Sequence, residues 1–401
     1  MKKNVLPILF VTLLIDMIGI GMLIPILPII LTDPSSPSFL LLGYSVKEQY
    51  LVAGFLTAIF GLMQFIAAPL LGELSDIYGR KRLLTLGVGL LALSQMVFGY
   101  GIVIASLPLL FVSRMVAGLA GANFSIAQAS IADVTLPQDR AKNFGLIGAA
   151  FGLGFIIGPV LSGFVAHATG NASAPFFLAG LFGIVNLLFI TYFLPETRKV
   201  EDRVWKKFSM LAGIRNIKSA LTDADTRPVY GASFLYQSGF TFFTSFVGVL
   251  LVSTYGFSET SIGTFFGAVG VCIVFTQLVI LRYLTKRYTE RQILRVSLIV
   301  LASVLALYPF APHIYILYTL VPILAIANGL SMANMGALIS KGVSKEKQGA
   351  ALGINGSLMA LAQGIAPLIA GIGSGIIGLQ APFVTGGLLV FGAWILLFKN
   401  R

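Results

Sequence analysis

The sequence predicts an all-α membrane protein of twelve transmembrane helices, arranged as two pseudo-symmetric six-helix bundles. Of its 401 residues, 57% are hydrophobic and only 10% are charged, whereas soluble domains carry about 25% charged residues. The mean hydropathy is +0.93. The apolar stretches are continuous and long enough to cross a bilayer, which takes about 20 helical residues. They lack the polar–apolar alternation of a membrane β-barrel, so the expected spans are helices.

Twelve apolar segments follow one another along the chain. The first begins like a secretory signal peptide, but Asp16 interrupts it and no small-residue cleavage site follows, so we expect an uncleaved span. The long polar stretch after the sixth segment predicts two bundles, 1–194 and 228–401, joined by a linker, 195–227. The predicted spans are 5–31, 48–73, 83–105, 107–134, 143–167, 174–194, 228–254, 260–284, 292–311, 313–340, 349–373 and 376–398.

Basic residues are distributed unevenly between the two sides of these spans. The termini and the even-numbered loops carry 25 of the 27 Lys and Arg residues, the odd-numbered loops carry only Lys47, and Arg114 lies inside a span. The positive-inside rule therefore predicts cytoplasmic termini and a cytoplasmic linker in a multi-pass protein of the inner (plasma) membrane. The same distribution accounts for the net charge of +12 without a nucleic-acid partner.

The two halves of the chain resemble each other at a shift of 208 residues. The fifth span, FGLIGAAFGLGFIIGPVLSG, aligns with LGINGSLMALAQGIAPLIAG in the eleventh, and the basic loop SDIYGRKRLL has a degenerate counterpart, TKRYTERQIL. Small-residue helices also align weakly by chance. The matching loops favour a true repeat, which predicts a substrate site at the midplane between the halves.

Asp16 lies near the middle of the first span. A carboxylate costs about 2.5–3.5 kcal/mol at the centre of a membrane helix, and such residues usually face a cavity and serve function. Removal from water also disfavours the charged form, as a proton carrier requires. The alternative is a structural, hydrogen-bonded Asp at a kink beside Gly19 and Gly21.

Arg114 is the only basic residue that lies more than one helical turn from the end of a predicted span. It begins a small, polar helix face that continues through Gly118 and Gly121 to Gln128, and such a face can line a cavity or allow close helix packing. We expect Arg114 to bind a negatively charged group or to organise the site at which the proton binds. By helical rise, it lies about 10 Å nearer the outside than Asp16, so direct pairing is not expected.

Two further groups of residues are candidates for gating and substrate binding. In the loop after the second span, glycines allow a tight turn, and Asp76 can meet a helix N-terminus or Arg140. Polar and aromatic residues inside other spans predict a cavity for an amphipathic solute, although ordinary helix packing could also explain them. These cavity candidates are Asn123, Gln128, Tyr236, Gln237, Phe240, Asn328, Asn334 and Asn355.

Signals for catalysis and cofactors are missing from the sequence. It holds no Ser/His/Asp set, metal-ligand spacing or phosphate loop, and its single cysteine, Cys272, permits no disulfide within the chain. The run GLGFIIGP (152–159) lacks the strand and the acid of a dinucleotide motif. We therefore expect no enzyme activity, cofactor or metal.

Several motifs resemble those of the major facilitator superfamily. GELSDIYGRKRLL (72–84) resembles its signature loop, AAFGLGFIIGPVLSGF (149–164) its fifth-span antiporter motif, and RMVAGLAGANFS (114–125) a motif of its drug:proton antiporters. The segments IDMIGIGMLIPILP, SIADVTLPQDRAKNFG and LPETR are similar to tetracycline-efflux proteins with twelve spans.

The resemblance implies roles for individual residues. It implies proton coupling by Asp16 and Arg114, together with an antiporter motif containing Gly154, Gly158 and Pro159. It also implies a latch that closes the cytoplasmic side in the outward-open state. The latch residues are Gly72, Asp76, Gly79, Arg80 and Arg140.

The expected function is proton-coupled export of small amphipathic molecules by a monomer whose partners are its substrate, protons and the lipid bilayer. Two alternatives remain open. The first is a transporter of a metabolite, sugar or lipid with the same fold. The second is a membrane nutrient sensor, against which stands the short central loop of about 30 residues without an output domain.

Overall fold

The computed structural model describes residues 5–121, 123–135, 140–198, 218, 222, 226–343 and 348–399. Within these ranges the chain is helical and contains no strand. Twelve helical spans are long and apolar enough to cross a membrane. The predicted fold class and the number of spans are therefore confirmed.

The first six spans contain eight helices, because spans one and four are each divided in two. In chain order these helices are α1 (Val5–Gly21), α2 (Leu23–Thr32), α3 (Val46–Tyr78), α4 (Arg80–Val103), α5 (Leu107–Ala120), α6 (Asn123–Val134), α7 (Arg140–Thr169) and α8 (Ala174–Phe193).

The last six spans are also helical, and a π-helical turn interrupts the eighth. In chain order the elements are α10 (Arg227–Tyr255), α11 (Glu259–Phe275), η4 (Thr276–Ile280), α12 (Leu281–Leu284), α13 (Glu290–Leu307), η5 (Tyr308–Phe310), α14 (Ile314–Lys341), α15 (Gln348–Ile376) and α16 (Ala381–Phe398).

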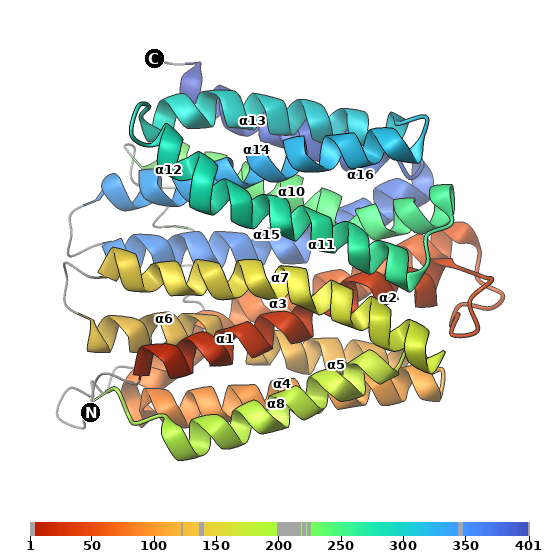
Figure 1. Cartoon of the computed structure of the whole chain (residues 1–401), viewed down its shortest axis with the longest axis horizontal. Coiled ribbons are helices and arrows are strands. Elements are labelled where there is room, and N and C mark those ends of the chain that lie inside the picture. The colour runs from red at the N-terminus through yellow and green to blue at the C-terminus, as the bar shows by residue number, and fades with distance from the viewer. Residues whose placement is uncertain are drawn as a thin grey trace.

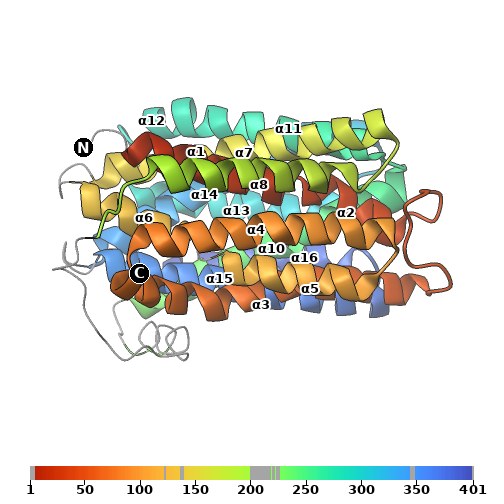
Figure 2. The same ribbon diagram turned by 90° about the horizontal axis from the view of Figure 1, so that it is seen from below.

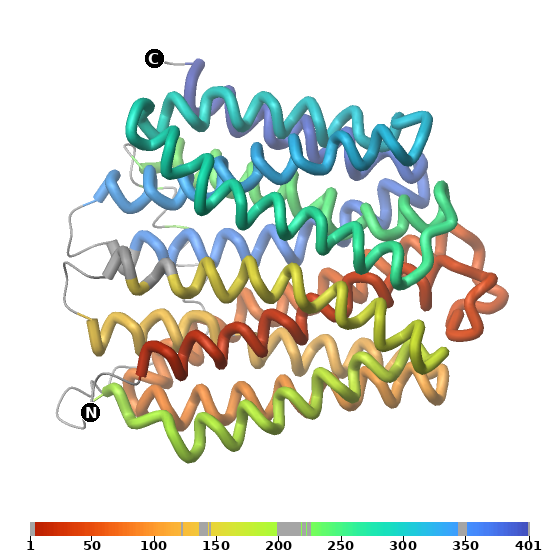
Figure 3. The backbone as a smooth tube through the Cα atoms, in the orientation of Figure 1, coloured from red at the N-terminus to blue at the C-terminus, as the bar shows by residue number. Residues whose placement is uncertain are grey.

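The helices run side by side along the long axis of the molecule (Figure 1). Helices α1 to α8 fill the lower part of that view, and α10 to α16 the upper part, and the Cα trace shows the same grouping (Figure 3). The view from below shows the helices running along the same axis (Figure 2). We call the end where α3 meets α4 the Gly79 end and the end with the 33–45 loop the Gly43 end. Helix α1 begins and α16 ends at the Gly79 end (Figure 1).

The breaks in spans one and four have identifiable causes and partners. In span one, Pro25 has no N–H to donate to the carbonyl four residues earlier, and the helix is interrupted at Met22. The Met22 carbonyl accepts a hydrogen bond from Ser162 Oγ at 2.7 Å. In span four, α5 ends at Gly121, whose carbonyl accepts from Gln64 Nε2 at 3.2 Å.

The two halves meet through glycines near the Gly43 end. On α3, a Cβ placed on Gly54 would lie 2.6 Å from the Pro367 carbonyl oxygen and 2.9 Å from Gly371 Cα. A Cβ on Gly263 of α11 would lie 2.5 Å from the Pro159 carbonyl oxygen of α7. Because these glycines lack side chains, backbones of the two halves come into direct contact there.

The same helices separate towards the Gly79 end. A Cβ on Gly148 of α7, or on Gly353 or Gly356 of α15, would meet no atom within 4 Å. These residues lie several turns along α7 and α15 from the packed positions Gly163 and Gly371. Among the described residues, the glycines of α7 and α15 therefore pack against the other half near the Gly43 end and border open space towards the Gly79 end.

We predict that Gly54→Ala opens the Gly43 end. The new methyl group overlaps the α15 backbone, and overpacking of this kind costs about 1–3 kcal/mol. Spin labels at Leu42 and Ile377, both 79% exposed, report the distance between the halves at this end once Cys272 is replaced by Ser. We expect a longer mean distance in Gly54→Ala.

Gly353→Ala is the matched control, because the same methyl group enters open space there. It should leave the distance distribution unchanged. An unaltered distribution in Gly54→Ala as well would contradict the role of this contact.

Candidate functional site

Asp16 is held by amide groups from two other spans. Its side chain is only 5% exposed. Asn123 Nδ2, on α6, donates to Asp16 Oδ2 at 3.0 Å, and Asn186 Nδ2, on α8, lies 3.5 Å from Oδ1. The Asn186 amide also reaches the Thr12 carbonyl oxygen at 3.4 Å. Donors from two helices thus surround a carboxyl that hydrocarbon alone would exclude.

A small cavity lies against the same carboxyl, inside the first half. Its volume is about 10 Å³, at the lower limit for holding one water molecule. Gln95 of α4 faces it and donates through Nε2 to the Gly19 carbonyl oxygen at 3.0 Å. The remaining wall is formed by Ile15, Gly19, Val88, Leu91, Ala92, Ala179 and Gly183.

Asn186 and Gln95 were not among the site residues predicted from the sequence. Each is the single amide in a largely apolar run, FGIVNLLF and LALSQMVF, and a polar residue inside a span is itself a signal of function. What the sequence did not indicate was that both side chains point towards Asp16. Asn123 was a candidate for the substrate cavity, and the structure places it against Asp16 instead of leaving it open.

Gly87 of α4 makes room for the Asn123 amide. A Cβ at this position would collide with Asn123 Oδ1. The amide therefore rests directly on the α4 backbone, with its Nδ2 turned to the carboxyl.

The predicted antiporter motif packs on the helix that carries Asp16. A Cβ on Gly154 would collide with Met17, and one on Gly158 would lie 2.6 Å from the Ile18 carbonyl oxygen. Pro159 contacts α1 at Gly21 through its ring and α11 through its carbonyl oxygen. Helix α7 therefore contacts the Asp16 helix on one face and the second half of the molecule on the other.

Arg114 lies apart from this cluster. Its guanidinium carbon sits 4.5 Å from the centre of the Phe60 ring on α3, and the side chain is 7% exposed. Its Nε has no hydrogen-bond partner, and no carboxylate in the described ranges forms an ion pair with it. One turn further on, Gly118 packs on the α3 backbone. The small face of span four thus serves close packing at Gly118.

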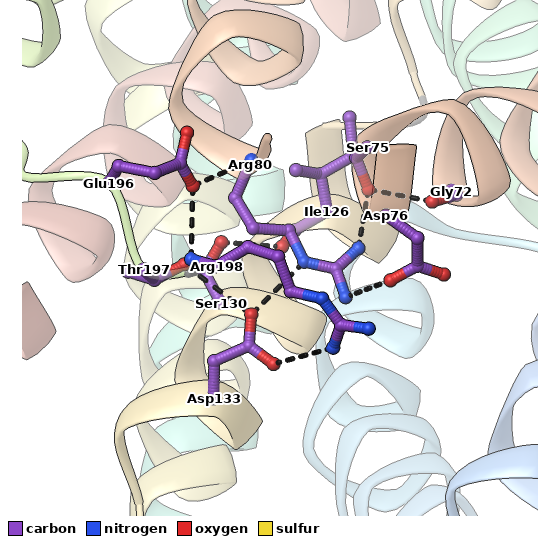
Figure 4. Close-up of polar contacts among 10 residues, drawn as sticks. All are labelled: Gly72, Ser75, Asp76, Arg80, Ile126, Ser130, Asp133, Glu196, Thr197 and Arg198. Atoms are coloured by element: carbon purple, nitrogen blue, oxygen red, sulfur yellow. Dashed lines mark hydrogen bonds and ion pairs between the residues drawn. The ribbon is translucent and has the colours of Figure 1, made fainter. Parts of the chain in front are cut away.

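A charged cluster, which we call the Arg80 cluster, joins three segments at the Gly79 end (Figure 4). The Arg80 guanidinium donates to Ser75 Oγ, to Asp76 Oδ1 at 2.6 Å and, through Nε, to Asp133 Oδ2 at 3.1 Å. Its backbone N–H donates to Glu196 Oε1 at 2.9 Å. The loop, the end of α6 and the segment after α8 are therefore tied together.

Asp76 was predicted to meet a helix N-terminus or Arg140. In the structure it pairs with Arg80, the first residue of α4 and four residues on along the chain. The Arg140 side chain lies outside the described residues. Asp133 and Glu196, to which no role was assigned, bind Arg80 from segments that are far away in sequence.

Gly72 and Gly79 frame this cluster. The Gly72 carbonyl oxygen accepts a hydrogen bond from Ser75 Oγ at 2.7 Å. Gly79 has a φ of 99°, a conformation that L-residues with a side chain rarely adopt, and it separates α3 from α4. A turn is therefore present at Gly79, whereas Gly72 lies inside α3.

The second-half cavity candidates fall into two groups. Tyr236, Asn328 and Asn334 are at most 4% exposed, and Tyr236 OH donates to Asn328 Oδ1 at 2.7 Å, from α10 to α14. Gln237, Phe240 and Asn355 are partly exposed, as is Gln128 in the first half. Asn355 Oδ1 accepts from Ser233 Oγ at 2.7 Å.

Comparisons with known proteins bear on the whole chain. The sequence profile of the Major Facilitator Superfamily matches residues 9–250 and 229–401.

The chain belongs to the major facilitator superfamily. It is therefore a multi-pass membrane transporter of that superfamily. Tetracycline resistance protein, class C, of Escherichia coli is 30% identical over 372 residues, covering 92% of this chain and 89% of the relative. Multidrug resistance protein 1 of Bacillus subtilis (strain 168) is 28% identical over 378 residues, covering 92% and 90%.

Among solved structures, this transporter resembles the human organic anion transporter MFSD10 (TETRAN). The TM-score is 0.75 at 26% identity, and the match covers 99% of both chains.

We predict that Arg80→Gln destabilises this transporter, because it leaves Asp133, 16% exposed, without its closest cation. Breaking a buried ion pair from one side costs roughly 3 kcal/mol. The drop should appear as a lower thermal midpoint of the purified protein in detergent. Adding Asp133→Asn to Arg80→Gln should recover part of the loss, since the unpaired charge is removed.

Arg82→Gln is the matched control, since Arg82 is exposed, and it should change stability by less than about 0.5 kcal/mol. Equal effects of the two substitutions would show that the Arg80 cluster contributes no more than ordinary surface charge.

Proposed function

We propose that this transporter exports small amphipathic molecules in exchange for protons. Two relatives that match over about nine-tenths of the chain are named for resistance to tetracycline and to multiple drugs. The buried Asp16 carboxyl supplies the group that such an exchange requires. The observation on which the proposal rests is the packing of α1, the helix of Asp16, against α7. Helix α7 in turn contacts the second half of the molecule.

Asp16 is the proton carrier in this proposal. A neutral, protonated carboxyl suits the interior of the bundle, while the two amides stabilise the ionised form, so both states are accessible. The polar side chains that face it are Gln95, Asn123 and Asn186, and none of them titrates. Its ionisation therefore responds to solvent access and to bundle geometry rather than to a neighbouring charge.

In the proposed cycle, the Gly79 end faces the cytoplasm, following the distribution of basic residues. Asp16 takes a proton while the Gly43 end is open, and the halves then rearrange to the arrangement seen here. The proton leaves to the cytoplasm, and the substrate enters and is carried outward. The inward membrane potential contributes about 2.3 kcal/mol per charge per 100 mV.

The Arg80 cluster serves in this cycle as the cytoplasmic latch. Asp76 is 41% exposed while the halves are apart at this end, so one carboxylate face is free to meet the second half when they close. The same proposal includes a location in the inner membrane, a monomeric state and a linker, 195–227, between two bundles. It also includes Arg140 as a residue of the latch. A midplane substrate site that includes Gln128, Gln237, Phe240 and Asn355 is also part of it.

The test is transport by purified protein in proteoliposomes under an imposed pH gradient. We predict that Asp16→Asn abolishes gradient-driven accumulation of a fluorescent drug substrate, because the amide cannot carry a proton. Exchange of substrate without a gradient should persist. Asp33→Asn is the matched control, since Asp33 lies in the loop at the Gly43 end and Asn also caps such turns.

Full gradient-driven transport by Asp16→Asn, at the wild-type rate, would overturn the proposed coupling. Loss of transport in both Asp16→Asn and Asp33→Asn would overturn the assignment of proton coupling to Asp16.

A second candidate function is the export of organic anions. Arg114 is a buried cation without a carboxylate partner in the described ranges, and such a charge favours a negatively charged occupant nearby. Phe60, over which it lies, is followed by Gly61, which packs on the α15 backbone of the other half. A structural relative with 26% identity is titled an organic anion transporter.

We predict that Arg114→Gln weakens the binding of anionic amphiphiles about tenfold or more, as expected for a lost charge-assisted contact. Neutral substrates of the same size should lose less than about threefold. The measurement is competition for transport by matched acids and their methyl esters. Equal losses for acid and ester would exclude the anion candidate and leave Arg114 a structural role on Phe60.

A further inference from the structure

The second half contains a cavity of about 230 Å³ at the Gly79 end. It lies between the start of α10, the start of α13 and the end of α14, which belong to the first, third and fourth spans of that half. Pockets for drug-sized ligands usually measure roughly 300–1,000 Å³. The cavity is therefore suited to a molecule smaller than a drug-sized cargo.

In the first half, the chain itself fills the corresponding place. The start of α1, the start of α4 and the end of α6 meet there, and the segment after α8 lies among them. Leu194 of this segment is 1% exposed and belongs to one hydrophobic cluster with residues of all three helices. Two residues on, the Glu196 carboxylate accepts the Arg80 backbone N–H (Figure 4). An apolar side chain followed by a carboxylate thus fills this place.

In the second half, the cavity wall carries positive charge instead. Its charged side chains are Arg291 and Lys341, and none of the described residues that line it is acidic. Lys341 pairs with Glu290, which lies outside the cavity wall. Arg291 is half-buried and forms no ion pair with a described residue. A positive charge that no described side chain neutralises therefore faces the cavity.

The helix ends around the cavity also favour an anion. Thr226 precedes the 29-residue helix α10, and its side chain makes no capping hydrogen bond. The N-terminus of a helix carries partial positive charge and N–H groups that bind anions. Where α14 ends, the Gly342 N–H donates to the carbonyl oxygens of Leu338 and Ile339, which leaves fewer free carbonyls to repel an anion.

The rest of the cavity wall is apolar. It is formed mainly by Val229, Tyr230, Leu338 and Ile339. A fully hydrated ion gains nothing from such a wall, whereas burial of a short hydrocarbon chain against it is favourable. The cavity thus offers an apolar surface next to a positive charge. These are the complements of Leu194 and Glu196, which fill the equivalent place in the first half.

We propose that this cavity binds one small phosphate monoester with a short hydrocarbon part, whose phosphate contacts Arg291 and Lys341. A phosphate monoester carries about −1.5 to −2 charge at pH 7 and three acceptor oxygens, which suits two cations beside a helix N-terminus better than a carboxylate does. The bound molecule joins α10 to α13 and α14. Residues 194–198 join α4 to the end of α6 in the same way.

The site is separate from the proposed proton coupling, because it lies at the Gly79 end of the second half and includes no residue that contacts Asp16. Two sources supply this chemistry. One is a soluble phosphate monoester, and the other is the headgroup of phosphatidic acid in the bilayer.

The test is the thermal midpoint of the purified, full-length protein in a neutral detergent, with NaCl as the reference at equal ionic strength. Butyl phosphate should raise the midpoint in a saturable way. Inorganic phosphate should need about fivefold more for the same rise, because it lacks the hydrocarbon part. Butanol should give no saturable rise, because it lacks the charge.

Arg291 provides variants that separate binding from folding. Arg291→Gln should raise the half-saturating concentration of butyl phosphate about tenfold or more, and Arg291→Lys, which keeps the charge, less than about threefold. Each variant is its own reference, because the shift is measured with and without the ligand. Arg287→Gln is the matched control: Arg287 is exposed, lies over the Tyr283 ring and is outside the cavity wall, so the response should be unchanged.

Lipid nanodiscs distinguish the two sources. If the lipid is the source, replacing part of the phosphatidylcholine by phosphatidic acid should raise the midpoint of the wild type but not of Arg291→Gln, and added butyl phosphate should have no further effect. If the source is soluble, butyl phosphate should raise the midpoint equally in both kinds of disc. Either result supports the site.

The absence of an Arg291-dependent rise with both butyl phosphate and phosphatidic acid would overturn the site. So would equal responses of the wild type and Arg291→Gln. These failures differ from failure of the proposed function, which is read from gradient-driven transport by Asp16→Asn.

Discussion

Helix α7 is the element on which the coupling of the two halves depends, because it is glycine-rich on two faces. Gly154 and Gly158 bring its backbone against α1, within one turn of Asp16, and Gly163 does the same against the start of α11. Backbone contacts of this kind have no flexible side chains to absorb a shift, so a displacement on one face is felt on the other. If a change in the charge of Asp16 moves α1, the movement is therefore transmitted through α7 to the interface between the halves.

The repeat places equivalent ion pairs at the same end of both halves, with their signs exchanged. In the first half Arg80 opens α4 and pairs with Asp133 at the end of α6; in the second, Glu290 opens α13 and pairs with Lys341 at the end of α14, at 2.5 Å. The separation between Asp133 and Lys341 is 341 − 133 = 208, the shift of the repeat. Glu290 suits the positive N-terminus of its helix. The positive charge of Arg80 is unfavourable at the positive N-terminus of α4. This accounts for the additional acceptors of Arg80, which are Asp76 and Glu196.

The spans, their number and the family could be predicted from the sequence because each depends on local composition. A run of apolar residues is helical in a bilayer whatever its neighbours, so all twelve spans were found. The breaks at Met22 and Gly121 were not predicted. Pro25 is a local signal for the first break, but the sequence does not show that Ser162 and Gln64 from other helices satisfy the freed carbonyls. The ion pair between Asp76 and Arg80 was not predicted either.

Asp16 was predicted as a site residue because a carboxyl inside a span is conspicuous in the sequence. Its hydrogen-bond partners were not predicted as such. Asn186 lies 170 residues away in sequence, and nothing local indicates which way its amide points. Helical rise predicts a separation between Arg114 and Asp16, and no ion pair joins them in the described ranges. The two-bundle division at 195–227 and the roles of the site residues stay predictions.

The central claim is that the proton on Asp16 sets the arrangement of the two halves. The most direct measurement is the distance between spin labels at the Gly43 end, recorded across a pH range without substrate. A protonated carboxyl favours the arrangement seen here, so the distance should shorten as the pH falls, and a variant with a permanently neutral residue 16 should stay short throughout. A distance that ignores pH, or that follows pH equally well without the Asp16 carboxyl, would contradict the account.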